Sequence, residues 1–389
     1  MHKTSLFSQN VAISILVSFT GCALLYIALI GPIIAALAVL ILALTLMVVA
    51  ERTGKVEHLY RALACHQGKS LTVIIVFVLI LPLILSNNYL LHVAVMGGIY
   101  SIVALGLNFQ VGTGMVNFAT AAFFGTGAYT SALLAINFGL SPWLTTVFGM
   151  VAAASLGIIF GFPALKTRGY YLSLITMSLQ IIFTLMIINT SWLGGPNGIP
   201  NIPAYSLGAT SLRMPIIIFG MDFPYQANYL YLVYSLLGLA MFVALRLHNS
   251  RTGLAWNAIE QDEIVAITQG INLTKSKLLA FALGAAFAGL AGGLYGHYTS
   301  FIGVEDFDFS KSLVFICMVL LGGMDNPLGV VLGALMLTII DEKLRDFADY
   351  RMLMYSVILI IILLARPQGL LPKRIRIYQA AKSIVNLKI

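Results

Sequence analysis

Apolar stretches of membrane-spanning length alternate with short polar segments along most of this chain. The first, from Val11 to Ala50, is too long for one crossing and breaks at Gly31-Pro32, so it predicts a helical hairpin. No Ala-x-Ala-like site follows its first apolar run, which argues against a cleaved signal peptide. Further apolar windows, several of them short or interrupted by Gly and Pro, predict helices over residues 71–86, 89–108, 116–136, 142–163, 171–190, 228–247, 277–296, 312–321, 327–340 and 352–366.

This pattern predicts an all-α, polytopic transmembrane helical bundle of about ten to eleven membrane segments, some of them short or broken. Composition agrees, because 60% of residues are hydrophobic and only 9% are charged, against roughly 25% charged in soluble domains. The period-two alternation of a membrane β-barrel is absent. Cys22, Cys65 and Cys317 have neither metal-ligand spacing nor a pairing pattern, so we interpret them as packing residues.

The distribution of basic residues sets the expected orientation. With the N-terminus in the cytoplasm, 17 of the 22 Lys and Arg residues fall in inside loops, as the positive-inside rule requires. The net charge of +8 therefore reflects membrane topology, and we expect no nucleic-acid partner. The basic residues assigned to outside loops are Arg213, Lys311, Lys343, Arg345 and Arg351.

The windows and charges divide the chain into three parts. Residues 1–69 are an N-terminal transmembrane hairpin with a basic cytoplasmic loop, and residues 70–372 are the membrane core. Within this core, residues 248–276 form a cytoplasmic loop. Residues 373–389 are a basic cytoplasmic tail.

The longest polar interruption, the polar segment, runs from Arg246 to Lys277. Asn249 or Ser250 can cap a helix start and Gly270 can end it, which predicts one helix of about five turns. A small, apolar stripe, with Asp262 in its midst, would lie against the bundle: Leu254, Ala255, Ala258, Ile259, Val265 and Ala266. The opposite stripe consists of Trp256, Glu260, Glu263, Ile264 and Ile267.

Two roles fit this predicted helix. It could rest on lipid headgroups, but interfacial helices usually carry Lys and Arg on their polar face. The interior of this helix carries acids instead, which favours contact of the opposite stripe with a partner protein.

Two Gly-rich regions follow different patterns. In residues 278–296 small residues recur at four-residue spacing, which predicts close helix packing inside the bundle or against another subunit. The two rows are Ala285, Gly289 and Gly293, and Ala288, Gly292 and Gly296. In residues 106–130 glycines mix with polar side chains at membrane depth, which indicates either lining of a translocation pathway or tight helix crossings. The candidates there are Asn108, Gly112, Gly114, Asn117, Thr120 and Tyr129.

No catalytic, cofactor-binding or metal-binding residue is expected. Gly112-Thr-Gly114 lacks the spacing and the Lys of a phosphate loop, and no Walker motif occurs in the chain. His92 and His297 have no acidic or Cys partner at ligand spacing. Any ATP and Mg must therefore be used by another polypeptide.

Four stretches, in this order and spacing, resemble the LivM type of ABC-transporter permease, the membrane subunits that import branched-chain amino acids. They cover most of the chain from about Tyr89 to Leu371. The stretches are Ala104–Asn108 with Ala121–Tyr129; Gly194–Ile199; Asp262-Glu263 with Gly270–Asn272 and Lys277–Phe281; and Gly322-Gly323 with Arg366–Leu371. The hairpin before residue 70 is an extension of the common core.

The resemblance implies a mechanism and partners. In that family the polar segment is similar to a relaxed EAA motif, whose helix docks into a cytoplasmic ATPase. Carried over, Glu260, Asp262, Glu263, Ala266 and Gly270 lie at the docking surface, and Trp256 and Ile264 lie on the stripe that faces outward. The implied partners are a second permease of the LivH type, two ATPase subunits that use ATP and Mg, a substrate-binding protein and membrane lipid.

The resemblance also implies the location and cargo. The chain is expected in the bacterial inner membrane, passing an amino acid such as leucine, isoleucine or valine. The region 89–136 and an outside loop are expected to contribute to the pathway. The loop residues are Gly194, Gly195, Asn197 and Gly198.

Two alternatives stay open. The chain departs from the family pattern at Ala119-Thr120, Glu260 and Asp325, which leaves room for urea, short amides or sugars as substrates. A secondary transporter driven by H⁺ or Na⁺ would normally need carboxylates within the membrane, whereas each Asp and Glu here falls in a loop or at the end of a span.

Overall fold

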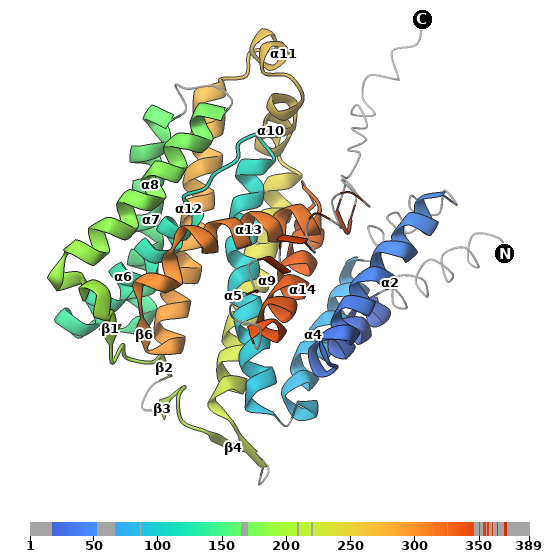
Figure 1. Ribbon diagram of the computed structural model, residues 1–389, viewed down its shortest axis with the longest axis vertical. Helices are drawn as coiled ribbons and strands as arrows, with labels where there is room; N and C mark the ends of the chain where they lie inside the picture. Colours follow the sequence, from blue (N-terminus) through green and yellow to red (C-terminus); the bar gives the residue numbers. More distant parts are fainter. Residues whose placement is uncertain are drawn as a thin grey trace, which may run out of the picture.

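The computed structural model describes residues 18–52, 67–85, 87–164, 170–207, 210–218, 221–324 and 326–345, together with single positions between 350 and 371. Within these residues the chain is a bundle of apolar helices, drawn in Figure 1 with most long axes running in similar directions. A helix over Ser18–Ile30 precedes the labelled helices. These are α2 (Ile33–Arg52), α4 (Gln67–Ile84), α5 (Asn88–Val111), α6 (Thr120–Phe138), α7 (Pro142–Ala164), α8 (Tyr170–Asn189), α9 (Tyr225–His248), α10 (Arg251–Gln261), α11 (Glu263–Thr268), α12 (Leu273–Thr299), α13 (Phe309–Gly322) and α14 (Pro327–Lys343).

The all-α, polytopic bundle expected from the sequence is confirmed. Six helices in the described part of the chain are long and apolar enough to cross a membrane: α5, α6, α7, α8, α9 and α12. The predicted span over 352–366 lies largely outside the described residues, as do the loop 53–66 and the tail 373–389.

Short strands, which the sequence pattern does not predict, lie at the opposite end of the bundle from α10 and α11 (Figure 1). Ile199–Pro200 (β1) pairs antiparallel with Phe301–Ile302 (β6), which joins the turn after α8 to the end of α12. Two hairpins follow β1 in the chain. They pair backbone N–H and C=O groups of the connection between α8 and α9. They are β2 (Ser206–Leu207) with β3 (Thr210–Ser211), and β4 (Ile216–Ile218) with β5 (Met221–Phe223).

The centre of the bundle is α12, which packs against α5, α6 and α7. Its glycines face neighbouring backbones. A Cβ on Gly292 would overlap the carbonyl oxygen of Phe124, and a Cβ on Gly289 would overlap the Cβ of Ala153. On the same helix a Cβ on Gly293 would lie 2.9 Å from the Thr146 side chain, whereas Gly296 has more room. The absence of side chains therefore lets three helices approach closely.

On the other side of α5, α14 packs along the helix and also contacts α2. The ammonium group of Lys343 donates to the carbonyl oxygen of Gly31, in the turn of the N-terminal hairpin. Glu342 accepts a hydrogen bond from the hydroxyl of Tyr89, at the start of α5. The hairpin is thus tied to the core at the same end of the bundle as the strands.

Candidate functional site

The polar segment contains two helices joined at an angle, so the prediction of a single five-turn helix is wrong. Asp262 ends α10 in an extended conformation and its carboxylate then accepts from the backbone N–H groups of Ile264 and Val265, at 2.8 and 3.1 Å. This is an N-cap, and it starts α11. The predicted limits hold, because Ser250 caps α10 and Gly270 follows α11 with φ of +81°.

The face of the polar segment that meets the bundle is built around an aromatic side chain. Trp256, placed on the outward stripe by the sequence pattern, is 5% exposed, and this part of the prediction is wrong. Its ring lies 5.7 Å from that of Phe109 on α5, and its indole N–H donates to Ser276 O on α12 at 2.9 Å. A large ring with a polar tip gains more from this buried, hydrogen-bonded position than from exposure. Ile259 and Ala266 are also buried.

The opposite face projects away from the bundle on α11 (Figure 1). Ile264 is 74% exposed, and Val265 and Ile267 are also more than half exposed. Val265, which was expected against the bundle, is exposed because the break at Asp262 changes the direction of the chain after α10. Leu254, which was expected on the same face, is also exposed, on α10 itself. The result is an apolar tip of three neighbouring side chains, an unusual feature on a short polar connection.

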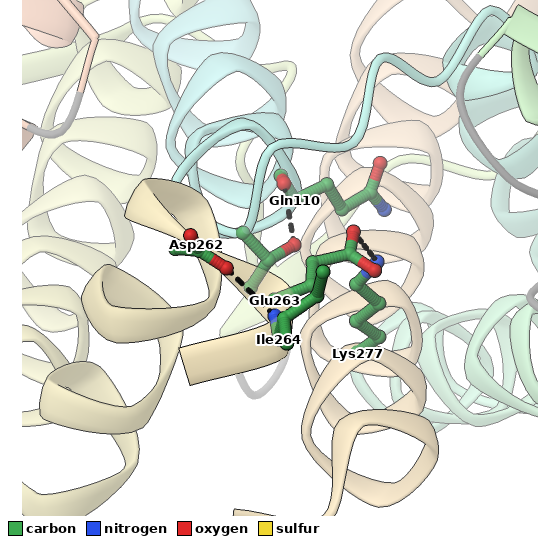
Figure 2. A network of polar contacts seen from close by, with 6 residues as sticks. Gln110, Asp262, Glu263, Ile264 and Lys277 are labelled. Atoms are coloured by element: carbon green, nitrogen blue, oxygen red, sulfur yellow. Dashed lines mark hydrogen bonds and ion pairs between the residues drawn. The ribbon is translucent and has the colours of Figure 1, made fainter. Parts of the chain in front are cut away.

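An ion pair holds this tip to the bundle. The Glu263 carboxylate lies 2.5 Å from the ammonium group of Lys277 on α12, and Figure 2 shows the two side chains meeting between the helices. The Lys277 side chain is largely covered, whereas that of Glu263 is about half exposed. The pair restricts the position of α11 relative to α12.

The segment between α5 and α6 runs close to α10. Thr113 Oγ1 donates to Gln110 O at 2.7 Å and closes the turn after α5. A Cβ on Gly114 would lie 3.9 Å from the Cα of Glu260, so the two backbones are neighbours. Asn108 and Gly112 are buried in this turn, and Gly112 N–H donates to Asn108 O. Of the predicted pathway residues, Gly114 thus lies beside the polar segment, and Asn108 and Gly112 lie at the end of α5 that leads to it.

Helix α6 begins inside the bundle, and its first N–H groups are satisfied by side chains. Asn117 Oδ1 accepts from Ala119 N–H at 2.8 Å. Gln180 Oε1 on α8 accepts from Ala122 N–H at 2.7 Å, and Ser312 Oγ on α13 accepts from Ala121 N–H at 2.9 Å. Thr120 Oγ1 bonds back to Asn117 O at 3.3 Å. Two predicted pathway residues, Asn117 and Thr120, therefore take part in capping a buried helix end, and both remain candidates for the pathway.

The predicted outside loop forms a tight turn against the end of α12. Gly194, Gly195 and Gly198 have positive φ angles, and a Cβ on Gly198 would overlap Ile302 O of β6. Asn197 is exposed at the surface of this turn.

Sequence reasoning missed a group of polar side chains near the middle of α5. Lys311, assigned to an outside loop, lies in the first turn of α13 with its ammonium 5.4 Å from the centre of the Tyr100 ring. Asp306, in the 3₁₀ turn Val304–Phe307, lies within electrostatic range of Tyr100, Tyr129 and Tyr295. Of these residues the sequence pattern identified Tyr129 alone. The alternation of charged and aromatic residues in Glu-Asp-Phe-Asp-Phe-Ser-Lys was the available signal.

Comparison with known proteins agrees with this architecture. Residues 89–365 match the family described as the branched-chain amino acid transport system permease component. The high-affinity branched-chain amino acid transport system permease protein LivM of Salmonella typhimurium is 38% identical over 72% of this chain and 69% of its own length, and LivM of Escherichia coli is 37% identical over the same shares. LivH of Salmonella typhimurium is 25% identical over 71% of this chain and 92% of its own length. No solved structure matches.

The match extends from the start of α5 past α14 and includes the polar segment, the buried start of α6 and the α12 packing. The homologues are transport permeases, and the apolar helices make this chain a multi-pass membrane protein. The chain thus belongs to the permease family of branched-chain amino acid ABC transport systems.

Proposed function

We propose that this chain is the membrane-spanning permease subunit of an ATP-driven importer in the bacterial inner membrane. It passes leucine, isoleucine, valine or a related amino acid that a substrate-binding protein delivers. Two cytoplasmic ATPase subunits supply the energy with ATP and Mg, and a second, LivH-type permease completes the membrane part. The relatives' names support the substrate and the second permease.

The observation that supports this function best is the construction of the polar segment. One face is fixed to the bundle by Trp256, and the other presents the apolar tip on α11. An ATPase groove that buries Ile264, Val265 and Ile267 would remove apolar surface from water, which favours docking at about 25 cal/mol per Å² before the costs of association.

The contacts of the segment supply a route for mechanical force. A shift of α11 acts on α12 directly through the Glu263–Lys277 ion pair. Through α10 it acts on α5 at the Trp256–Phe109 contact, and on the segment that leads to α6 where Glu260 meets Gly114. ATP-driven closure of the ATPases would thus reach three membrane helices from one docking element.

The test of coupling uses the complete transporter with charge-changed variants. Glu263→Lys places two ammonium groups together, so we expect leucine uptake in proteoliposomes to fall at least about tenfold, with the chain still inserted. The double variant Glu263→Lys with Lys277→Glu restores opposite charges and is expected to recover much of the uptake. If Glu263→Lys alone transports and retains its ATPases like the wild type, the proposed role of the ion pair is wrong.

A second pair of variants addresses the end of α11. Gly270 has φ of +81°, which proline cannot adopt and asparagine tolerates. We expect Gly270→Pro to lose ATPase association and uptake, and Gly270→Asn to retain both. Co-purification of the ATPases measures association, and normal association of Gly270→Pro would contradict docking at α11.

The substrate is tested separately by uptake with the binding protein present. Labelled leucine, isoleucine and valine are expected to accumulate in an ATP-dependent way, and urea and sugars are not. Uptake of urea, an amide or a sugar in their place would reassign the cargo. Uptake driven by an ion gradient without ATPases would replace the proposed class.

A further inference from the structure

Lys311 and Asp306 take no part in the proposed coupling route. Placing two charged side chains inside a membrane bundle nevertheless costs free energy. Lys311 and Asp306 are half-buried, and both lie near Tyr100, at the middle of α5. A charged side chain at the centre of a membrane bundle costs at least about 2.5 kcal/mol on insertion scales, and such residues usually face a substrate or ion pathway.

Several aromatic rings pack together next to these two charged residues. Phe124 of α6 contacts the rings of Tyr295 and Phe307 at centroid distances of 5.4 and 5.3 Å. Tyr129 contacts Phe307 at 5.6 Å. The rings come from α6, α12 and the turn Val304–Phe307, so the surface exists only in the folded bundle. Phe124 and Phe307 are 1% and 0% exposed in this conformation, so their rings meet a branched side chain or a cation only when the helices around them move apart.

One hydroxyl in this group lacks a partner. Tyr129 is 4% exposed, and among the described residues its hydroxyl makes no hydrogen bond. A buried hydroxyl without a partner costs about 1–3 kcal/mol, so such a group usually serves a ligand or a bound water. Asp306 lies within electrostatic range of this hydroxyl, and one oxygen of its carboxylate accepts from Gly303 N–H at 3.0 Å.

The charges also have the balance that a zwitterion requires. Tyr100 lies within electrostatic range of one ammonium, on Lys311, and two carboxylates, on Asp306 and the buried Asp341. An added ammonium group is therefore attracted, while the ammonium group of Lys311 can donate to a carboxylate. Asp306 and Lys311 are only half-buried, whereas Tyr129, Phe124 and Phe307 are buried. A substrate therefore reaches the whole group only while the helices are apart, which suits brief contact better than tight capture.

We infer that Asp306, Lys311 and Tyr129 form a transient binding site for the α-amino and α-carboxylate groups of the transported amino acid, between α5, α6, α12 and α13. The substrate ammonium donates to the Asp306 carboxylate and the Tyr129 hydroxyl oxygen, and Lys311 donates to the substrate carboxylate. When the helices around Phe124 and Phe307 move apart, the apolar side chain of the substrate lies against these two rings. This site rests on the proposed function, because it presupposes an amino acid as cargo.

The test compares leucine with two analogues that each lack one charged group. Saturation-transfer NMR on the complete transporter, without the binding protein, uses leucine, 3-methylbutylamine and 4-methylpentanoate as probes. In the wild type we expect leucine to bind at least about tenfold more tightly than either analogue, the effect of losing one charge-assisted hydrogen bond. Lys311→Met should weaken leucine to the level of the amine without changing the amine. Asp306→Asn should weaken leucine to the level of the acid without changing the acid.

Uptake provides the second measurement. Capture by the binding protein sets the KM, so we expect Lys311→Met, Asp306→Asn and Tyr129→Phe to lower Vmax while KM stays constant. The matched controls are Glu305→Gln, at the exposed neighbour of Asp306, and Tyr234→Phe, whose hydroxyl donates to Ala94 O away from the site. These controls should transport like the wild type, and the site variants should match them in thermal stability.

The outcomes separate the two proposals. Equal weakening of leucine and the amine by Lys311→Met, or unchanged binding and uptake in all three site variants, would overturn the site while the wild type still transports leucine. A wild-type transporter that takes up no amino acid would overturn the proposed function itself.

Discussion

At the scale of single residues, close helix packing in this protein depends on glycines of α12, which have no side chain. A Cβ on Gly292 would overlap Phe124 O, and a Cβ on Gly127 of α6 would overlap the backbone of Gly289. By contrast, Gly238 on α9 has no atom within 4 Å of such a Cβ. Glycine is thus required for close packing at position 292 of α12, whereas position 238 of α9 has room for a side chain.

A matched pair of alanine substitutions tests this difference. Gly292→Ala should destabilise the protein by about 1–3 kcal/mol, the usual cost of overpacking a core. Gly238→Ala should be neutral or slightly stabilising, because alanine is the better helix former by up to about 1 kcal/mol. Thermal unfolding of the purified chain in detergent measures both, and an equal response would contradict the packing argument.

At the scale of elements, the buried start of α6 links three helices through hydrogen bonds. Gln180 of α8 accepts from Ala122 N–H and donates to Phe307 O at 2.7 Å, and it also accepts from Ser312 Oγ of α13 at 3.1 Å. A helix that begins inside the bundle cannot use water for its first N–H groups. The side chain of Gln180 therefore holds α6, α8 and the turn before α13 in one arrangement.

Replacing this side chain should loosen that arrangement. Gln180→Leu keeps a similar volume but leaves Ala122 N–H and Phe307 O without their partner, at a cost of about 1–3 kcal/mol for each buried group. Ser178→Ala, on an exposed position of the same helix, is the control. We expect a lower melting temperature in detergent for the first variant alone. A similar melting temperature for both would show that Gln180 is dispensable.

At the scale of the whole molecule, the N-terminal hairpin lies before the part of the chain that matches the family. The family match begins at residue 89, whereas the helix Ser18–Ile30 and α2 lie before it. The hairpin contributes two apolar runs and leaves the basic residues Arg52, Lys55, Arg61 and Lys69 after it. Its removal would therefore preserve the side on which this basic loop lies.

Deletion of residues 2–50 tests this topology. We expect the orientation of the core to stay the same, with some loss of stability because Lys343 loses Gly31 O as its acceptor. In a background with the native cysteines replaced by alanine, a cysteine at Glu305 should react with an impermeant reagent from outside, and one at Ile264 from inside. Exchange of the two sides after the deletion would contradict the charge-based orientation.

The sequence predicted those features that depend on long apolar windows and on local capping. The helices, the polar segment, its limits at Ser250 and Gly270, and the all-α bundle follow from such patterns. The break at Asp262 was missed because the same residue can continue one helix or cap the next, and packing decides which occurs. The burial of Trp256 depends on Phe109, a partner far away in the chain.

The half-buried position of Lys311 in α13 was missed for a similar reason. A lysine before a short apolar window is normally read as a loop residue, and its position beside Tyr100 depends on α13 crossing the bundle at an angle to the long helices (Figure 1). Periodicity along one helix carries no information about such crossings. The pathway roles of Asn108, Gly112, Gly114, Asn117, Thr120, Tyr129 and the Gly194–Gly198 turn stay predictions.

The glycine contacts also indicate where this protein can move. Where the backbones of two helices touch, no side chain lies between them that could change rotamer. Helices α12, α6 and α7 therefore form one rigid block. A second block forms where Gly322 and Gly333 bring α13 and α14 together in the same way. Between the blocks, α5 meets α14 through side chains such as Leu335, which can slide. A shift at that boundary would move Lys311, on α13, relative to Tyr100, on α5, while the hydrogen bond from Ala121 N–H to Ser312 Oγ keeps the start of α13 next to α6.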